Sequence, residues 1–147
     1  MDKYDPVRIE NQLCFPLYAA AREVVRLYGP ALTKLDLTYT QYITMMVLWD
    51  NESMSVKELG SRLFLDSGTL TPVLKSLEKK GYVARSRSTE DERVLIVRTT
   101  EAGQALRDEA LAVPGTVACG ICLSSEEAKT LHALLCKMLK DFGCRRE

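Results

Sequence analysis

The segment from Ser67 to Gly81, with the two apolar stretches behind it, constrains the fold of this 147-residue chain more than any other feature. Its apolar residues recur at i, i+3, i+4 and i+7, the spacing of one buried helical face: Leu70, Val73, Leu74 and Leu77. Gly81 stands where the C-terminus of that helix is expected. Residues 82–88 and 93–99 read as β-strands, and the polar residues 89–92 between them predict a hairpin.

Two helices are predicted before this unit. Residues 41–50 are almost wholly apolar, which indicates a buried helix. Ser55, with Glu58 three residues later, has capping-box spacing at the start of a short helix. The order helix, turn, short helix, turn, helix, hairpin predicts a winged helix-turn-helix, in a chain that is mostly α-helical with a β-hairpin wing.

Longer helices are expected on both sides of this unit. Asp5-Pro6 resembles a helix start, and the helix is expected to run to about Tyr28 and to end at Gly29-Pro30. A helix from about Thr100 to Ala112 is expected to break at Pro114-Gly115. A last helix is expected over residues 124–142.

A winged helix-turn-helix places its second helix in the major groove of DNA, and here that is the helix over residues 67–80. Lys, Arg, Asp and Glu balance over the whole chain at 20 basic and 20 acidic residues, but residues 55–98 hold nine basic and six acidic ones, an excess of three. Small hydroxyls and a lysine on the helix, and arginines on the wing, suit phosphates and base edges. Asp91 is expected to orient the Arg93 guanidinium by a charge-assisted pair. The expected DNA contacts are Ser67, Thr69, Thr71, Lys75, Arg85, Arg87, Asp91 and Arg93.

The rest of the sequence excludes several classes of protein. The N-terminus lacks the apolar core of a signal peptide, and the longest apolar run, residues 42–49, is too short to cross a membrane. A cytoplasmic protein with reduced thiols is expected, and its five cysteines do not suggest a secreted disulfide scaffold. No phosphate loop, Ser/His/Asp set or carboxylate pair is present, so we expect neither an enzyme nor a cofactor or metal.

Cys14 lies on the first expected helix, in one stripe with Tyr18 and Tyr28. On a continuous helix Tyr28 lies roughly 21 Å from Cys14 of the same chain, so it could reach only the Cys14 of a second chain. A helix starting at Pro6 puts Cys14 in its third turn, beyond the reach of the helix dipole, and Pro16 is expected to loosen the backbone there. The pattern alone leaves open whether Cys14 is reactive or a small core residue.

The wing residues Thr89-Glu90-Asp91-Glu92-Arg93 and the following Thr99-Thr100-Glu101-Ala102-Gly103 resemble the signature of MarR-type regulators. Residues 10–15 through Arg22-Glu23, residues 65–72 and residues 90–93 resemble, more narrowly, the OhrR branch of organic-hydroperoxide sensors. The resemblance covers essentially the whole chain. It implies a homodimeric repressor of one domain, residues 1–147, with residues 38–100 binding DNA and residues 1–37 and 101–147 forming the dimer. A pseudo-palindromic operator suits such a dimer.

The same resemblance implies a chemistry. Cys14 is oxidised by an organic hydroperoxide, Tyr28 and Tyr39 of the partner subunit hydrogen-bond its sulfur, and Tyr18 lies one turn away. In the two-cysteine type, the oxidised thiol forms a disulfide with a cysteine near the last helix of the other subunit, and DNA is released. Cys119 is the expected partner and Cys122 the second choice.

Other interpretations stay open. Cys119 and Cys122 suit a short disulfide with each other, and together with His132 and Cys136 they would supply four zinc ligands. A MarR-type regulator that releases DNA on binding a small aromatic ligand, with Cys14 structural, is the alternative function. A thiol peroxidase is the third candidate, but it would have no use for a wing and a reading helix.

Overall fold

The structure is a computed structural model that describes residues 2–144 of the chain. Its α-helices and strands are α1 (Cys14–Lys34), α2 (Tyr39–Asn51), β1 (Ser53–Ser55), α3 (Val56–Leu63), α4 (Ser67–Lys79), β2 (Val83–Arg87), β3 (Leu95–Thr99), α5 (Glu101–Glu109), α6 (Val113–Ala118) and α7 (Ser125–Cys144). Three short 3₁₀ turns complete them: Asp5–Val7, Ile9–Asn11 and Ala110–Ala112.

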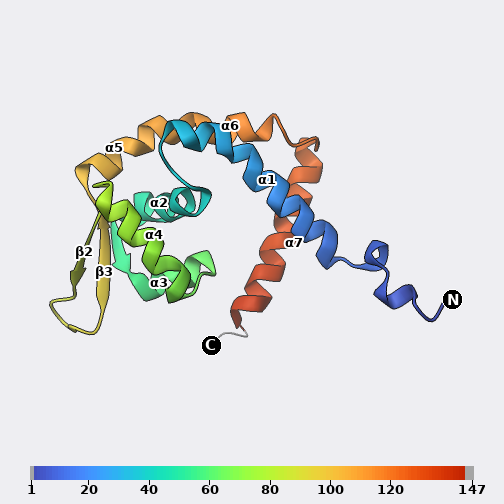
Figure 1. Cartoon of the computed structure of the whole chain (residues 1–147), viewed down its shortest axis with the longest axis horizontal. Coiled ribbons are helices and arrows are strands. Elements are labelled where there is room, and N and C mark those ends of the chain that lie inside the picture. Colours follow the sequence, from blue (N-terminus) through green and yellow to red (C-terminus); the bar gives the residue numbers. More distant parts are fainter. Residues whose placement is uncertain (1, 145–147) are drawn as a thin grey trace.

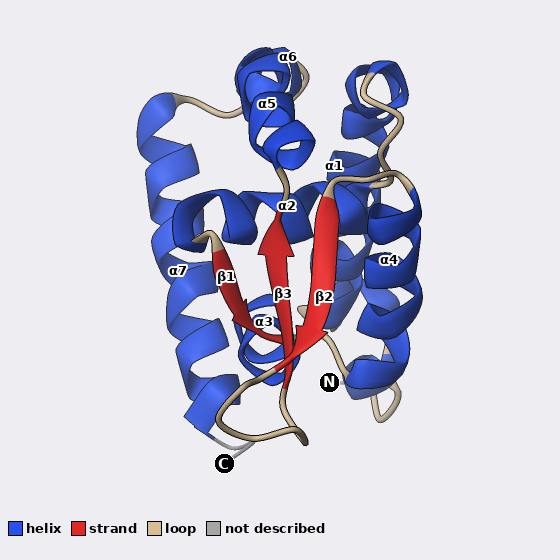
Figure 2. Ribbon diagram, turned by 90° about the vertical axis from the view of Figure 1, so that its left-hand side faces the viewer, coloured by secondary structure: helices blue, strands red, loops and turns tan. Residues whose placement is uncertain are grey.

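Helices α2, α3 and α4 and the small sheet form the winged helix-turn-helix, which is confirmed (Figures 1 and 2). The sheet is antiparallel with strand order β1-β3-β2, and Met54 faces Val97 while Val83 faces Thr99. Strand β1 is not predictable from the sequence, because three residues are too few to show an alternating pattern. The connection between β2 and β3 projects from the sheet as the wing.

The core lies between α2, α4 and the sheet. Met45 and Leu48 of α2 are fully buried, as the apolar run predicts. The stripe of α4 is buried at Leu70, Leu74 and Leu77, and Ser55 accepts a hydrogen bond from the Glu58 backbone N–H at the start of α3. These short-range signals predict the structure correctly because they depend on neighbours within one or two turns.

The expected start of the first helix is wrong. Side chains just before α1 bind carbonyls that a helix starting at Pro6 would need: the Asn11 amide donates to Asp5 O at 2.8 Å and the Gln12 amide to Pro6 O at 2.6 Å. Such competition disfavours α-helix, and the chain forms two 3₁₀ turns instead. Helix α1 begins at Cys14.

The expected ends at prolines are also wrong. Helix α1 continues through Pro30 to Lys34, because its last turns bury Leu32 and Leu35 against the core, and that burial offsets the cost of an internal proline. Pro114 does not end a helix but lies in the first turn of α6, where its missing N–H costs nothing. Figure 1 shows α5 and α6 following one another along the top of the molecule.

Two helices leave apolar side chains uncovered. Among residues 125–143, all of them on α7, none is buried, and Leu131, Leu134, Leu139 and Phe142 are exposed. Helix α1 likewise exposes Phe15, Leu17, Val25 and Leu27, and Leu13 just before it is also exposed. Figure 1 shows α7 and the N-terminal part of α1 extending away from the winged head. Among the described residues, no helix has the length and apolar character to span a membrane.

Candidate redox site and nucleic-acid interface

Cys14 is the first residue of α1 and is exposed as a free thiol. The residue before it, Leu13, provides no side-chain cap. Pro16, two residues later, lies in the first turn, where backbone N–H groups have no helical acceptor anyway. The expectation that Pro16 loosens a mid-helix backbone is therefore wrong, because it stands where proline is tolerated.

The later start of α1 also overturns the expectation that Cys14 lies beyond the reach of the helix dipole. The positive end of a helix dipole acts on the first turn, and Cys14 occupies that turn instead of the third. An anion formed at this sulfur would lie beside uncapped backbone N–H groups. The distance of Cys14 from the helix start is therefore no longer an argument against an effect of the dipole.

Tyr18, one turn after Cys14, is held by Arg22. The Arg22 guanidinium donates to the Tyr18 hydroxyl at 3.3 Å and lies 5.5 Å from the ring centroid. Among the described residues, no hydrogen bond joins Tyr18 to Cys14. The tyrosine is 60% exposed, so it borders the thiol without binding it.

Tyr28 and Tyr39 form an aromatic pair at the other end of α1. Their centroids are 5.0 Å apart in an edge arrangement, and Tyr42 lies 5.8 Å from Tyr28. Burial, and then the charge that Tyr28 would carry, raises the pKa of Tyr39. Both phenols are half-buried. A raised pKa keeps the Tyr39 hydroxyl protonated, and therefore a hydrogen-bond donor.

The pair cannot serve the thiol of its own chain. Helix α1 is unbroken from Cys14 past Tyr28, so the rise per residue separates them by roughly 21 Å. Any contact between Cys14 and these phenols must come from another copy of the chain.

Cys119 and Cys122 lie in the turn after α6, and both are exposed free thiols. Gly120 between them packs on α1, where a Cβ would lie 3.0 Å from a methyl carbon of Leu27. Leu27 precedes Tyr28 in the sequence. The turn that carries the two thiols therefore packs on α1 at the residue before Tyr28.

Cys136 on α7 is a further thiol, and its sulfur contacts a histidine. Its sulfur lies 3.6 and 3.8 Å from the two ring nitrogens of His132, one turn earlier on α7. Within the described part of the chain, no three His, Cys, Asp or Glu side chains are grouped as metal ligands. The structure thus does not bring Cys119 and Cys122 to this pair, as the zinc interpretation would require.

Three of the expected DNA contacts on α4 lie in its first turns, and Lys75 lies further along the helix. Asp66 caps the helix by accepting the Thr69 N–H at 2.8 Å, and this hydrogen bond lowers the pKa of the Asp66 carboxyl. Ser67, Thr69 and Lys75 are exposed, while Thr71 is half-buried. The N-terminus of α4 therefore presents small side chains and backbone N–H groups, which suit phosphates.

The wing differs from the expectation at two residues. The Arg85 guanidinium is bound by Glu78 of α4, with Nη2–Oε2 at 2.6 Å and Nε–Oε2 at 3.0 Å. It ties β2 to the reading helix, and a contact with DNA stays a prediction. Asp91 accepts the backbone N–H of Arg93 at 2.9 Å, so it shapes the wing turn instead of pairing with the guanidinium as expected.

Two basic side chains of the wing stay available. Arg87 and Arg93 are exposed, and among the described residues neither guanidinium has an ion pair or hydrogen bond. They border a shallow hollow at the wing tip with Ser88, Thr89 and Glu92.

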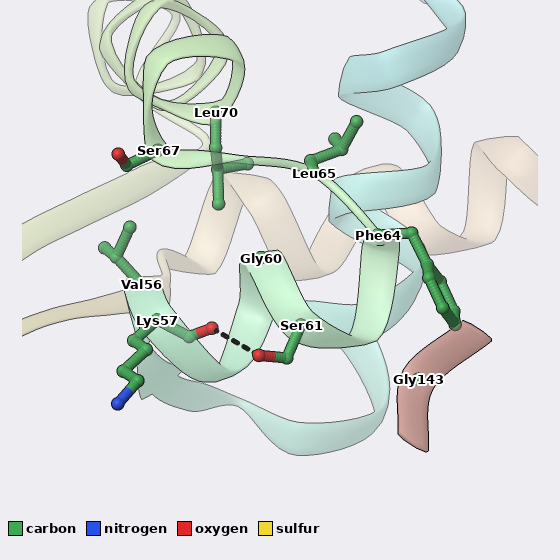
Figure 3. Close-up of a pocket in the computed structure, with 9 residues that line it drawn as sticks. All are labelled: Val56, Lys57, Gly60, Ser61, Phe64, Leu65, Ser67, Leu70 and Gly143. Carbon is green, nitrogen blue, oxygen red and sulfur yellow. Dashed lines mark hydrogen bonds between the residues drawn. The ribbon is translucent and has the colours of Figure 1, made fainter. Parts of the chain in front are cut away.

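A further hollow lies between α3 and the start of α4, as Figure 3 shows, and sequence reasoning misses it. Its floor includes Val56 and Leu70, and Gly143 at the end of α7 borders it. A Cβ at Gly60 would lie 2.8 Å from the Leu65 carbonyl oxygen, so this glycine permits the close approach of helix and turn. No periodicity could have shown this hollow, because α7 reaches it from the far end of the chain.

Comparison with known proteins gives consistent results. Residues 26–110 match the family described as transcriptional regulator SarA/Rot. The organic hydroperoxide resistance transcriptional regulator of Bacillus subtilis is 45% identical over 139 residues, which are 95% of this chain and 95% of that protein.

Two solved structures are similar over nearly the whole chain. Reduced AbfR bound to DNA, a protein of Staphylococcus epidermidis, is 35% identical, with a TM-score of 0.76 over 95% of this chain and 98% of that one. A cysteine-to-serine mutant of MarR from E. coli, complexed with operator DNA, is 26% identical, with a TM-score of 0.77 over 95% and 99%.

Proposed function

The chain belongs to the MarR family of transcriptional regulators, in the SarA/Rot group, and from that premise we propose that it is a homodimeric repressor whose Cys14 senses organic hydroperoxides. The observation that carries the proposal is the position of Cys14, exposed at the start of α1 and far from the phenol pair at the other end of that helix. The site is complete only when two chains lie with their α1 helices antiparallel.

The exposed apolar faces of α1 and α7 support this dimer. Large uncovered apolar surface marks an interaction site. Here both α1 and α7, the two helices that extend away from the winged helix-turn-helix, expose such surface. A symmetric pair would cover both helices and bring Tyr28 and Tyr39 of each chain to Cys14 of the other. It would also present two α4 helices and two wings to a two-fold operator.

The proposed reaction has two steps. The Cys14 thiolate attacks the O–O bond of the hydroperoxide, becomes a sulfenic acid, and releases the alcohol. The thiol of Cys119 in the other subunit then attacks the Cys14 sulfur, which forms a disulfide and expels water. The phenols of Tyr28 and Tyr39 would donate hydrogen bonds to the thiolate, and Cys122 is the second choice for the attacking thiol.

Release of DNA follows from where the bond forms. Helix α1 packs on both α2 and α6, so a covalent bond at its N-terminus pulls on the helices that set the distance between the two reading heads. A half-site spacing of roughly 34–36 Å tolerates little change. The relative from Bacillus subtilis, by its name, serves organic hydroperoxide resistance, which agrees with this signal. We place the reaction in the cytoplasm, where DNA lies and thiols stay reduced.

The alternative is a regulator that releases DNA on binding a small aromatic ligand. The hollow between α3, α4 and the end of α7 favours it, since a ligand there would touch the reading helix at Ser67. In that case Cys14 would be structural.

One experiment separates the two. Binding to the protein's own promoter is measured with and without cumene hydroperoxide, for the wild type and for Cys14→Ser, with Cys136→Ser as the matched control. We expect cumene hydroperoxide to release the promoter DNA from the wild type and from Cys136→Ser, whereas Cys14→Ser stays bound. Equal release from all three would overturn it and leave the ligand alternative.

A further inference from the structure

The turn after α6 holds two thiols where the proposed function uses one. Cys119 and Cys122 are both exposed and both free, and neither has a hydrogen bond through its sulfur among the described residues. This spare thiol is the feature that the proposed sensing chemistry leaves unexplained.

The short turn between the two cysteines permits a bond between them. Cys119 has helical dihedral angles, φ −64° and ψ −23°. The helical pattern ends just beyond it: Gly120 N donates to Val117 O at 2.9 Å and Ile121 N to Ala118 O at 3.2 Å, and Cys122 follows outside the helix. Residues three apart on a helix have Cβ atoms roughly 5–6 Å apart, and a disulfide needs Cβ atoms about 3.5–4.5 Å apart. The Cβ atoms must therefore come closer by roughly 1–2 Å, and Cys122 lies in a segment that no helical hydrogen bond holds.

The turn is also anchored. Gly120 packs on Leu27 of α1, and a Cβ there would lie 3.0 Å from one Leu27 methyl carbon and 3.1 Å from the other. This contact restrains the backbone between the two thiols, and both thiol side chains are exposed. Only two residues separate Cys119 from Cys122, so the two stay close when the Cys119 sulfur is bonded to Cys14.

We propose that Cys119 and Cys122 form a terminal redox pair that takes over the oxidation from Cys14. This inference rests on the proposed function, which supplies the intersubunit disulfide between Cys14 and Cys119. The Cys122 thiolate attacks the Cys119 sulfur, the bond from Cys119 to Cys14 breaks, and Cys14 leaves as a thiolate that takes up the proton lost by Cys122. The oxidised pair remains within one chain, in the joint between α6 and α7, and Cys14 is again reduced.

The consequence is that the covalent dimer is an intermediate. One hydroperoxide molecule oxidises the pair of one subunit, and the Cys14 that reacted is then a free thiol again. Without attack by Cys122, the disulfide between Cys14 and Cys119 would instead persist until an external reductant reduces it.

The test follows the crosslink over time. Reduced protein receives one equivalent of cumene hydroperoxide, samples are quenched with N-ethylmaleimide, and non-reducing gels are combined with peptide mass spectrometry. The wild type is expected to show a crosslinked dimer that rises and then decays, while a peptide with the Cys119–Cys122 disulfide accumulates. In Cys122→Ser the crosslink is expected to last at least about tenfold longer. Cys136→Ser is the control and should behave as the wild type does.

Two outcomes would overturn the inference that Cys122 takes over the oxidation. If the crosslink lasts as long in the wild type as in Cys122→Ser, and no Cys119–Cys122 peptide appears, exchange does not occur although Cys14 senses the peroxide. If the Cys119–Cys122 disulfide forms equally fast in Cys14→Ser, the pair is oxidised directly and not through Cys14. Failure of the proposed function is distinguishable, because then the wild type shows no Cys14 oxidation at all.

Discussion

Replacing Leu131 and Leu134 by alanine should dissociate the dimer without unfolding the subunit. The two side chains lie three residues apart on one face of α7, and they are 46% and 56% exposed in the single chain. Together they leave uncovered about as much apolar surface as one whole leucine. Burying a leucine contributes about 1.5–3 kcal/mol, and a symmetric interface counts each change twice, which gives about 3–6 kcal/mol.

Alanine retains a Cβ, so the lower end of that range applies. A loss of about 3 kcal/mol raises the dimer dissociation constant by roughly a hundredfold. Sedimentation velocity over a dilution series measures that constant, and circular dichroism checks that the helices remain. Lys129→Ala, an exposed change on another face of α7, is the control. An unchanged dissociation constant for the double variant would refute the assignment of this face to the dimer.

Three further changes test other parts of the structure. Arg85→Ala should lower the free energy of unfolding at pH 7 in urea titrations, and this loss should shrink as the pH falls. Hydrogen bonds from Arg85 lower the pKa of Glu78, so the pair stabilises the fold above the unfolded pKa of that carboxyl and stops doing so as the pH falls through the folded one. Gly103→Ala should cost about 1–3 kcal/mol, seen as a lower melting temperature, since its Cβ would lie 2.0 Å from the Tyr82 carbonyl oxygen; an unchanged melting temperature would contradict that packing. Arg93→Ala should weaken operator binding and reduce the slope of log K against log salt by about 1 for each phosphate that the arginine neutralises, whereas an unchanged slope would remove it from the interface.

The parts of the fold that the sequence predicts are those whose causes are local. The α4 stripe ending at Leu77 and the cap at Ser55 depend on residues within one or two turns. The start of α1 is not predicted because Asn11 and Gln12 bind backbone carbonyls six residues earlier, a competition that helical periodicity does not register. Pro30 misleads because burial of Leu32, a tertiary effect, offsets its local preference.

In the candidate site, too, features with local causes are predicted from the sequence and features that depend on tertiary contacts are not. Helical rise alone predicts that Cys14 and Tyr28 of one chain cannot meet, and the unbroken α1 agrees. The role of Arg85 is not predictable, because its partner Glu78 lies seven residues away across a turn whose geometry the sequence leaves open. The packing of Gly120 on Leu27 joins distant parts of the chain, and no motif announces it.

Mixed dimers test the central claim, that the thiol of one subunit works with the phenols of the other. In the first, one chain carries Cys14→Ser and the other carries Tyr28→Phe with Tyr39→Phe, so the single thiol faces intact phenols. In the second, one chain is unchanged and the other carries all three substitutions, so the single thiol faces phenylalanines. Both dimers have the same composition and differ only in which chains hold the changes.

The measurement is the rate of Cys14 oxidation by cumene hydroperoxide in each mixed dimer, followed by trapping the sulfenic acid with dimedone. We expect Cys14 of the first dimer to be oxidised at the rate of the wild-type thiol, and Cys14 of the second dimer to be oxidised more slowly. Equal rates in the two, or the reverse order, would contradict it.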